Sequence, residues 1–250
     1  MLRTARLPLL LLMAVGCVPP EVDPPGEEPA PPDAGPNPTY TASRVTSTCE
    51  DLSSAEVLEF GAFTHVTAYK DLPFPFPLFG ETATRFVATE QGQLFLGGAS
   101  LFVSTAGEPR RPPDARLPNG WLAPFWDSRL TALDSTQSDV RVLRTGTGAN
   151  ERLVIGYNHF TLRFPSDTVP NPHVRLSFQV ALLRGSQEIE FRYCQLDPGP
   201  EPGQELRARV LGSAAEIGLE SSDGTLGVSY SFQTPLDLSE GNAIRFTPGS

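Results

Sequence analysis

Lysine is almost absent from this sequence: Lys70 is the only one in 250 residues, and the arginines are scattered rather than clustered. Acidic residues outnumber basic ones by 29 to 19, so the formal net charge is −10 at pH 7. A protein that binds a phosphate backbone needs a basic patch or stripe. We therefore expect no nucleic-acid partner, and the same sign of charge argues against electrostatic adhesion to anionic lipid.

Catalytic and metal-binding motifs are also missing from the sequence. The three histidines, His65, His159 and His173, have neither zinc-ligand spacing nor cysteine neighbours. There is no Gly-x-Ser-x-Gly nucleophile elbow and no glycine-rich phosphate loop. A catalytic triad can be assembled from distant positions, so a secreted hydrolase stays as a less favoured hypothesis. The expectation is a protein that is not an enzyme and that uses no cofactor and no metal.

The apolar run at residues 7–15 is too short to span a bilayer as a helix. It follows two arginines and leads into Ala14-Val15-Gly16-Cys17, which is the order of a secretory signal with small residues before the cleavage site. The cysteine at that position resembles a bacterial lipobox, in which the thiol is acylated. The alternative is an ordinary signal peptide with a chance cysteine. We expect residues 1–16 to be a lipoprotein signal peptide and Cys17 to be the lipidation site.

Residues 17–38 are dominated by proline and acidic side chains, with almost no large apolar ones. Such a composition cannot bury enough surface to offset the entropy of the chain, so we expect a disordered tether. An extended proline-rich chain of this length reaches roughly 60 Å. The partner at its end would be a membrane, bound through at least two acyl chains. The expected location is the outer membrane or the cell surface, with its periplasmic face as the alternative.

Cys49 and Cys194 are the two cysteines that remain once Cys17 is set aside. An even number of cysteines in an oxidising compartment predicts a disulfide. The Cα atoms of the pair should then lie about 4.4 to 6.8 Å apart. Two unrelated buried thiols are the alternative.

Alternation of apolar and polar residues with a period of two predicts β-strands in residues 39–250 and no helix. The runs are short and are separated by turn signals such as Gly185-Ser186 and Asp223-Gly224. About ten short strands at this spacing predict an all-β domain, a two-sheet antiparallel β-sandwich. Alternation is seen in residues 64–69, 139–143, 176–182 and 188–193, and further short runs are residues 85–88, 94–96, 153–157, 215–219, 228–232 and 244–246.

Residues 176–193 form the clearest predicted hairpin, with glycine in its turn. The side chains expected to point into the core are Phe178, Val180, Ile189 and Phe191. The side chains expected to face water are Glu188, Glu190 and Arg192. A shift of one residue would reverse both sets.

Several motifs occur in a characteristic order, and the most specific are Ala123-Pro124-Phe125-Trp126-Asp127 and the Phe178-Gln179-Val180 strand. In sequence and order, these motifs resemble nidogen-like extracellular domains and their bacterial relatives. Glu90-Gln91-Gly92 departs from the family, which usually has Ser-Asn-Gly there. The resemblance covers roughly residues 60 to 247 and implies a secreted β-rich module of adhesion or matrix type, without established catalytic residues. Its segments are residues 72–80, 86–97, 119–127, 152–155, 176–182, 189–193 and 217–231.

Three aromatic residues, Phe74, Phe76 and Trp121, are candidate ligand contacts for an envelope or extracellular protein or glycan. The prolines around the two phenylalanines would present them at low entropic cost. The alternative for these two is an edge segment that packs its rings into the sandwich while its prolines block further pairing. Trp126 is expected in the core.

Asp127 could bind calcium together with Asp134 or Asp139, but no spaced aspartate run is present, and a turn carboxylate is the favoured interpretation. The sequence as a whole predicts a lipid-anchored envelope lipoprotein whose sandwich is a non-catalytic binding or adhesion module. A structural envelope lipoprotein without a specific ligand is the main alternative. A large exposed aromatic patch would favour the first of these.

Overall fold

The computed structural model describes residues 39–61, 65–98, 107–134, 137–164, 170–236 and 241–249. The expected signal peptide, Cys17 and the tether lie outside these residues. No helix within the described ranges has the length and apolar character needed to cross a membrane.

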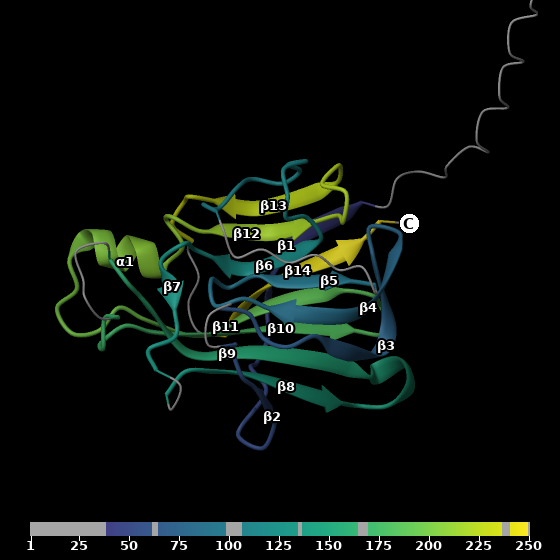
Figure 1. Cartoon of the computed structure of the whole chain (residues 1–250), viewed down its shortest axis with the longest axis horizontal. Helices are drawn as coiled ribbons and strands as arrows, with labels where there is room; N and C mark the ends of the chain where they lie inside the picture. The colour runs from purple at the N-terminus through teal and green to yellow at the C-terminus, as the bar shows by residue number, and fades with distance from the viewer. Residues whose placement is uncertain are drawn as a thin grey trace, which may run out of the picture. The chain divides into compact units, whose positions relative to one another are not determined.

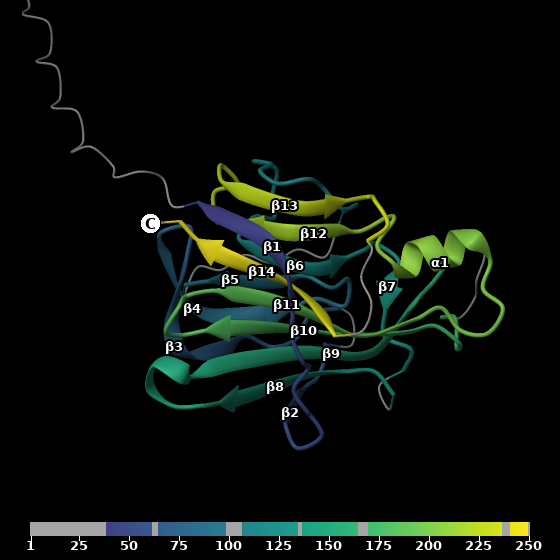
Figure 2. The ribbon, with the colours of Figure 1, turned by 180° about the vertical axis from the view of Figure 1, so that it is seen from behind.

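Two antiparallel sheets form the described domain (Figure 1), which confirms the predicted β-sandwich. In order, the first sheet contains β1 (Tyr40–Thr46), β14 (Asn242–Pro248), β11 (Ile189–Asp197), β10 (Arg175–Leu183), β9 (Arg152–Leu162), β8 (Asp139–Thr145) and β2 (Glu56–Leu58), and β7 (Leu130–Thr131) also pairs with β9. The second sheet contains β13 (Gly227–Phe232), β12 (Glu216–Glu220), β6 (Trp121–Trp126), β5 (Leu94–Gly97), β4 (Glu81–Ala88) and β3 (Lys70–Leu78). Figure 2 shows the first sheet from its outer side.

The pattern of the sequence predicts fewer strands than the structure contains. It also fails to predict the one α-helix of the described residues, α1 (Gln204–Val210). The extra strands lack a clear alternating pattern: β7 has two residues and β2 three. β3 carries Pro73, Pro75 and Pro77. It is the last strand of the second sheet, as expected of a segment whose prolines cannot donate to another neighbour.

The core lies between the sheets and contains a stack of three aromatic rings. Phe178 of β10 stacks on Phe125 of β6 with ring centroids 5.9 Å apart, and on Tyr157 of β9 with centroids 4.7 Å apart. All three side chains are fully buried. The buried Tyr157 hydroxyl is satisfied because it donates to the Gln93 carbonyl oxygen at 2.7 Å. The four residues predicted to point inward from the hairpin are all at 0% exposure, which confirms that prediction: Phe178, Val180, Ile189 and Phe191.

The prediction that Glu190 and Arg192 face water is wrong: they are only 3% and 6% exposed. Glu188, the third member of the set, is partly exposed. The cause is a segment from far away in the sequence, residues 47–55, which we call the strap. It lies over the outer face of the first sheet, where Ser47 donates to Glu190 at 3.1 Å. Arg192 and Arg245 pair with the same carboxylate, so the buried charges are compensated.

The strap is joined to β11 by the disulfide between Cys49 and Cys194, whose Cα atoms are 5.8 Å apart. This confirms the predicted pairing and falls in the predicted range. The neighbouring Glu50 backbone exchanges two hydrogen bonds with the Gln179 side chain, of 2.9 and 2.8 Å. Leu52 packs closely over Gly156, where a Cβ atom would lie 2.2 Å from the leucine Cδ1 and would displace that side chain.

A second buried cluster lies on the outer face of the second sheet. It consists of Phe95, Trp121, Ala123 and Trp126, and we call it the tryptophan cluster. Leu122 and Phe125, from the same strand, belong to the core between the sheets. Trp126 is therefore buried as predicted, at 2% exposure, but it packs edge-on against Trp121 outside the main core, with ring centroids 5.3 Å apart.

Candidate functional site

The three aromatic residues considered as ligand contacts are inside the protein. Phe74 is 3% exposed, and Phe76 and Trp121 are 0% exposed. The two phenylalanines belong to the main core, and Trp121 belongs to the tryptophan cluster. None of the three rings has a face open to a ligand, so the prediction that they contact a ligand is wrong. The two phenylalanines instead pack into the sandwich, which was the alternative interpretation.

Large apolar side chains are sparse on the described surface. Those that are clearly exposed are Val57, Tyr69 and Leu117, at 48%, 50% and 69%, and they come from three separate segments. They do not make an aromatic patch. Single exposed apolar residues of this kind are normal on protein surfaces.

The aspartates considered as calcium ligands have other partners. The Arg129 backbone N–H donates to Asp127 Oδ1 at 2.8 Å, as expected of a turn carboxylate. Asp139 accepts hydrogen bonds from Arg141 and Asn158. Among the described residues, no group of three or more His, Cys, Asp or Glu side chains is placed to hold a metal ion.

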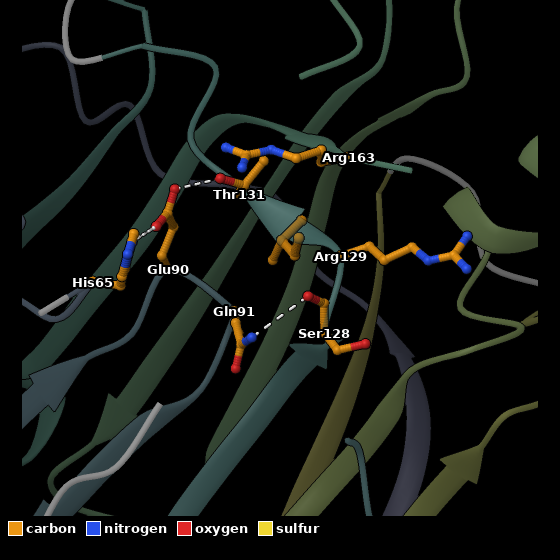
Figure 3. A pocket seen from close by; sticks show the side chains of 8 residues that line it. His65, Glu90, Gln91, Ser128, Arg129, Thr131 and Arg163 are labelled. Atoms are coloured by element: carbon orange, nitrogen blue, oxygen red, sulfur yellow. Dashed lines mark hydrogen bonds and ion pairs between the residues drawn. The ribbon is translucent and has the colours of Figure 1, made fainter. Parts of the chain in front are cut away.

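A hollow of about 260 Å³ in the described surface is shown in Figure 3. Its walls come from four parts of the chain: the segment before β3, the β4–β5 turn, the β6–β7 turn with β7, and the residue after β9. The lining side chains are His65, Glu90, Gln91, Ser128, Arg129, Leu130, Thr131 and Arg163.

Gly92 brings the two turns of the hollow together. Its φ of +82° favours glycine, and a Cβ atom there would lie 2.1 Å from the Phe125 carbonyl oxygen and 2.8 Å from Leu130 Cδ2. The close approach also allows the Asp127 N–H to donate to the Gln91 carbonyl oxygen at 3.2 Å. The β4–β5 turn therefore packs directly on the β6–β7 turn.

Glu90 organises one wall of the hollow. Its carboxylate accepts hydrogen bonds from the Thr131 hydroxyl and, at 2.8 Å, from the Ala132 backbone N–H. Its other oxygen lies 2.5 Å from His65 Nδ1. The glutamate side chain is 15% exposed and the histidine 62%, so Glu90 is fixed in the wall and presents the imidazole to solvent. This pair also borders a second hollow of about 530 Å³ next to β2.

Gln91 forms the floor of the hollow (Figure 3). Its amide nitrogen donates to the Ser128 carbonyl oxygen at 3.4 Å, and its Oε1 is buried without a partner among the described residues. Buried polar atoms are rarely left unpaired, so such an acceptor is a place for a water molecule or a ligand donor.

Two arginines border the hollow and differ in orientation. Figure 3 shows Arg163 passing above Thr131, whereas Arg129 extends away from the hollow. The Arg129 guanidinium lies 5.0 Å from the centroid of the Phe164 ring. Arg163 is exposed, and its guanidinium has no hydrogen-bond or ion-pair partner within the part of the chain that the structure describes. It is therefore the cation available to a ligand.

A buried ion pair supports the β6–β7 turn from behind. Asp127 is 0% exposed, and its Oδ1 lies 2.5 Å from Arg209 Nη2. Burial raises the pKa of Asp127, and the Arg209 guanidinium opposes that rise. Because Arg209 comes from α1, this contact fixes the helix to the turn that carries Ser128 and Arg129.

Sequence analysis identified Glu90-Gln91-Gly92 only as a turn that departs from the family pattern. Two of its side chains prove to line the hollow, so the departure was a usable signal. His65, Thr131 and Arg163 carried no signal, because they approach Glu90 only through the pairing of separate strands.

In the comparison with known families, the family model described as NIDO related matches residues 39–248. No curated protein matches the chain. No solved structure matches it either.

Proposed function

Because the chain belongs to the NIDO-related family, we propose that its domain is a non-catalytic binding or adhesion module for a protein or glycan. The observation that supports this is the hollow of Figure 3, which combines fixed and free polar groups. Glu90 holds His65 in place, Gln91 offers a buried free acceptor, and Arg163 offers a free cation. Polar groups that are held before binding keep the entropic cost of recognition low.

The ligand class follows from these groups. A guanidinium and an imidazole favour carboxylate or hydroxyl oxygens, and the Gln91 carbonyl oxygen favours a hydroxyl or amide donor. Acidic sugars and acidic peptide segments carry both kinds of group. The binding role needs no nucleophile: the Thr131 hydroxyl is directed at Glu90, and His65 lies on the other oxygen of that carboxylate.

We further propose that the domain is held at the outer membrane or cell surface of a bacterium by lipid on Cys17, with residues 18–38 as a tether. The order of basic, apolar and small residues before Cys17 supports this anchor.

Acylation of Cys17 is tested by growing the bacterium with a labelled fatty acid. The wild-type protein should take up the label, and Cys17→Ser should remain an unlabelled, uncleaved precursor, because only the thiol can be acylated. Equal labelling of the two proteins would refute the lipoprotein assignment.

Binding through the hollow is tested with residues 39–250, which contain the whole described sandwich, in pull-downs from envelope extract. Arg163→Ala should weaken capture about ten- to hundredfold, because a hydrogen bond to a charged group contributes roughly 1.5 to 3 kcal/mol. Gln91→Ala should weaken it less.

Arg85→Ala is the matched control, because it removes an arginine from β4 that pairs with the exposed Asp71 and is not part of the hollow. Capture that survives both hollow variants unchanged would place the site elsewhere. An extract that yields no captured molecule at all would favour the second candidate, a structural envelope lipoprotein. The scarcity of exposed apolar surface among the described residues supports that candidate.

A further inference from the structure

Two glutamates of β12 lie on the outer face of the second sheet, beside the tryptophan cluster. The pairing of β12 with β6 places Glu216 opposite Trp126 and Leu219 opposite Leu122. Paired residues point to the same side of a sheet, so Glu220, the residue after Leu219, lies beside Trp121. Residues 107–118 cover this face, and we call them the cover. Its Asp114 N–H donates to Glu220 Oε1 at 2.8 Å.

Unpaired polar atoms gather under the cover. Both glutamates are 0% exposed. Glu216 accepts a hydrogen bond from Ser229 at 3.1 Å through its other oxygen, Oε2. Neither carboxyl lies within ion-pair distance of a cation in the described chain. Five buried atoms of this region have no hydrogen-bond partner among the described residues: Glu216 Oε1, Glu220 Oε2, Trp121 Nε1, Trp126 Nε1 and Asn119 Oδ1.

Burial makes the charged form of both glutamates unfavourable. It raises the pKa of Glu216 to about 8 and that of Glu220 to about 7. The groups that oppose this rise are Ser229 and Arg111 at Glu216, and the Asp114 N–H and Arg110 at Glu220. The groups that add to it are Glu220 at Glu216, and the Asp114 carboxylate at Glu220. Burial outweighs the opposing groups, so both side chains are neutral in mild acid.

The floor of this region is a strand inside a hydrogen-bonded sheet, whereas the cover is a loop without strand or helix. β12 lies between β6 and β13, and its Ile217 and Leu219 are part of the main core. The cover is held by side chains: Arg110 lies 5.7 Å from the Trp126 ring centroid and Arg111 5.4 Å from that of Phe232. Within the described chain, no backbone–backbone hydrogen bond joins the cover to either sheet. Its largest apolar side chain, Leu117, points to solvent.

We propose that Glu216 and Glu220 form a proton-operated latch for the cover. While both carboxyls are protonated, the cover stays docked on the tryptophan cluster. Ionisation requires water at the carboxylates, and the cover is the element that can yield to admit it. The aromatic surface of Trp121 and Trp126 then becomes accessible on the alkaline side of neutrality. This latch is independent of the hollow proposed for ligand binding.

The sign of the pH dependence follows from proton binding. The docked form keeps its protons up to a pH of about 7 to 8, whereas a solvated glutamate loses its proton near pH 4.3. Between those values the docked form binds more protons than the open form. Raising the pH through this window therefore weakens docking progressively.

The chain has only two tryptophans, and both lie in the cluster, so intrinsic fluorescence reports on this region alone. We expect the emission maximum of the wild-type domain to shift to the red between pH 5 and 9. Quenching by acrylamide should rise several-fold over the same range, because docking weakens as the pH rises towards the pKa values of the docked carboxyls. Far-UV circular dichroism should stay constant, which separates opening of the cover from unfolding.

The double variant Glu216→Gln/Glu220→Gln keeps the shape of both side chains and removes their titration, so its quenching should stay low at every pH. Glu188→Gln, at the residue just before β11 of the first sheet, is the control and should behave as the wild type. The latch is refuted if wild-type quenching is flat from pH 5 to 9, or if the double variant shows the same transition. Should that variant not fold, hydrogen exchange at the Asp114 amide of the wild type decides. After correction for intrinsic rates, loss of protection above about pH 8 supports the latch and constant protection refutes it.

Discussion

Replacing Phe178 with alanine is expected to lower the free energy of unfolding of the domain by about 3 to 5 kcal/mol. The ring is fully buried and stacks on Phe125 of one sheet and Tyr157 of the other. Its removal leaves a cavity where the two sheets meet, and the neighbouring rings cannot fill it without leaving their own contacts. The midpoint of a denaturant titration should fall strongly, because domains are typically stable by only about 5 to 15 kcal/mol.

Tyr69→Ala is the matched control, because this aromatic side chain is 50% exposed and lies over Arg85 at the surface. It should cost less than about 1 kcal/mol. If Phe178→Ala shifts the denaturation midpoint as little as Tyr69→Ala does, then the core does not lie between the sheets as described.

Removal of the disulfide, as Cys49→Ser/Cys194→Ser, is expected to destabilise the domain by at most about 5 kcal/mol. The bond closes a loop with a sequence separation of 145, so it restricts the unfolded chain over most of the domain. It also fixes the strap over the buried Glu190 and Arg192. The measurement is a denaturant titration of the oxidised wild type, the reduced wild type and the double variant.

Reduction should bring the wild type to the midpoint of the double variant, and the variant itself should not respond to the reductant. Leu52→Ala separates the packing of the strap from its covalent link, because it deletes a buried strap side chain and keeps the bond. A wild-type midpoint that reduction leaves unchanged would mean that Glu50 and Leu52 hold the strap without the disulfide.

The local alternation of apolar and polar residues predicts the strands and the side of each strand that faces the core of the sandwich. The alternation of Phe178 and Val180 with polar neighbours indicates which side of β10 faces the core, and the structure agrees. The cysteine pair also follows from the sequence, through the count of thiols and the expected oxidising compartment. The glycine of Glu90-Gln91-Gly92 indicates the turn that borders the hollow, although not the hollow itself.

The sequence by itself determined the β-sandwich class, the inward residues of its hairpin and the disulfide pair. Only the tertiary structure decided what covers the outer faces of the two sheets. A period of two separates the sides of a strand, but it does not tell whether the second side meets water or another part of the chain. The strap reaches β11 and the cover reaches β12 across sequence separations of 145 and 106 residues. For this reason Glu190 and Arg192 are buried rather than solvated, and Glu216 and Glu220 are enclosed beside the two tryptophans.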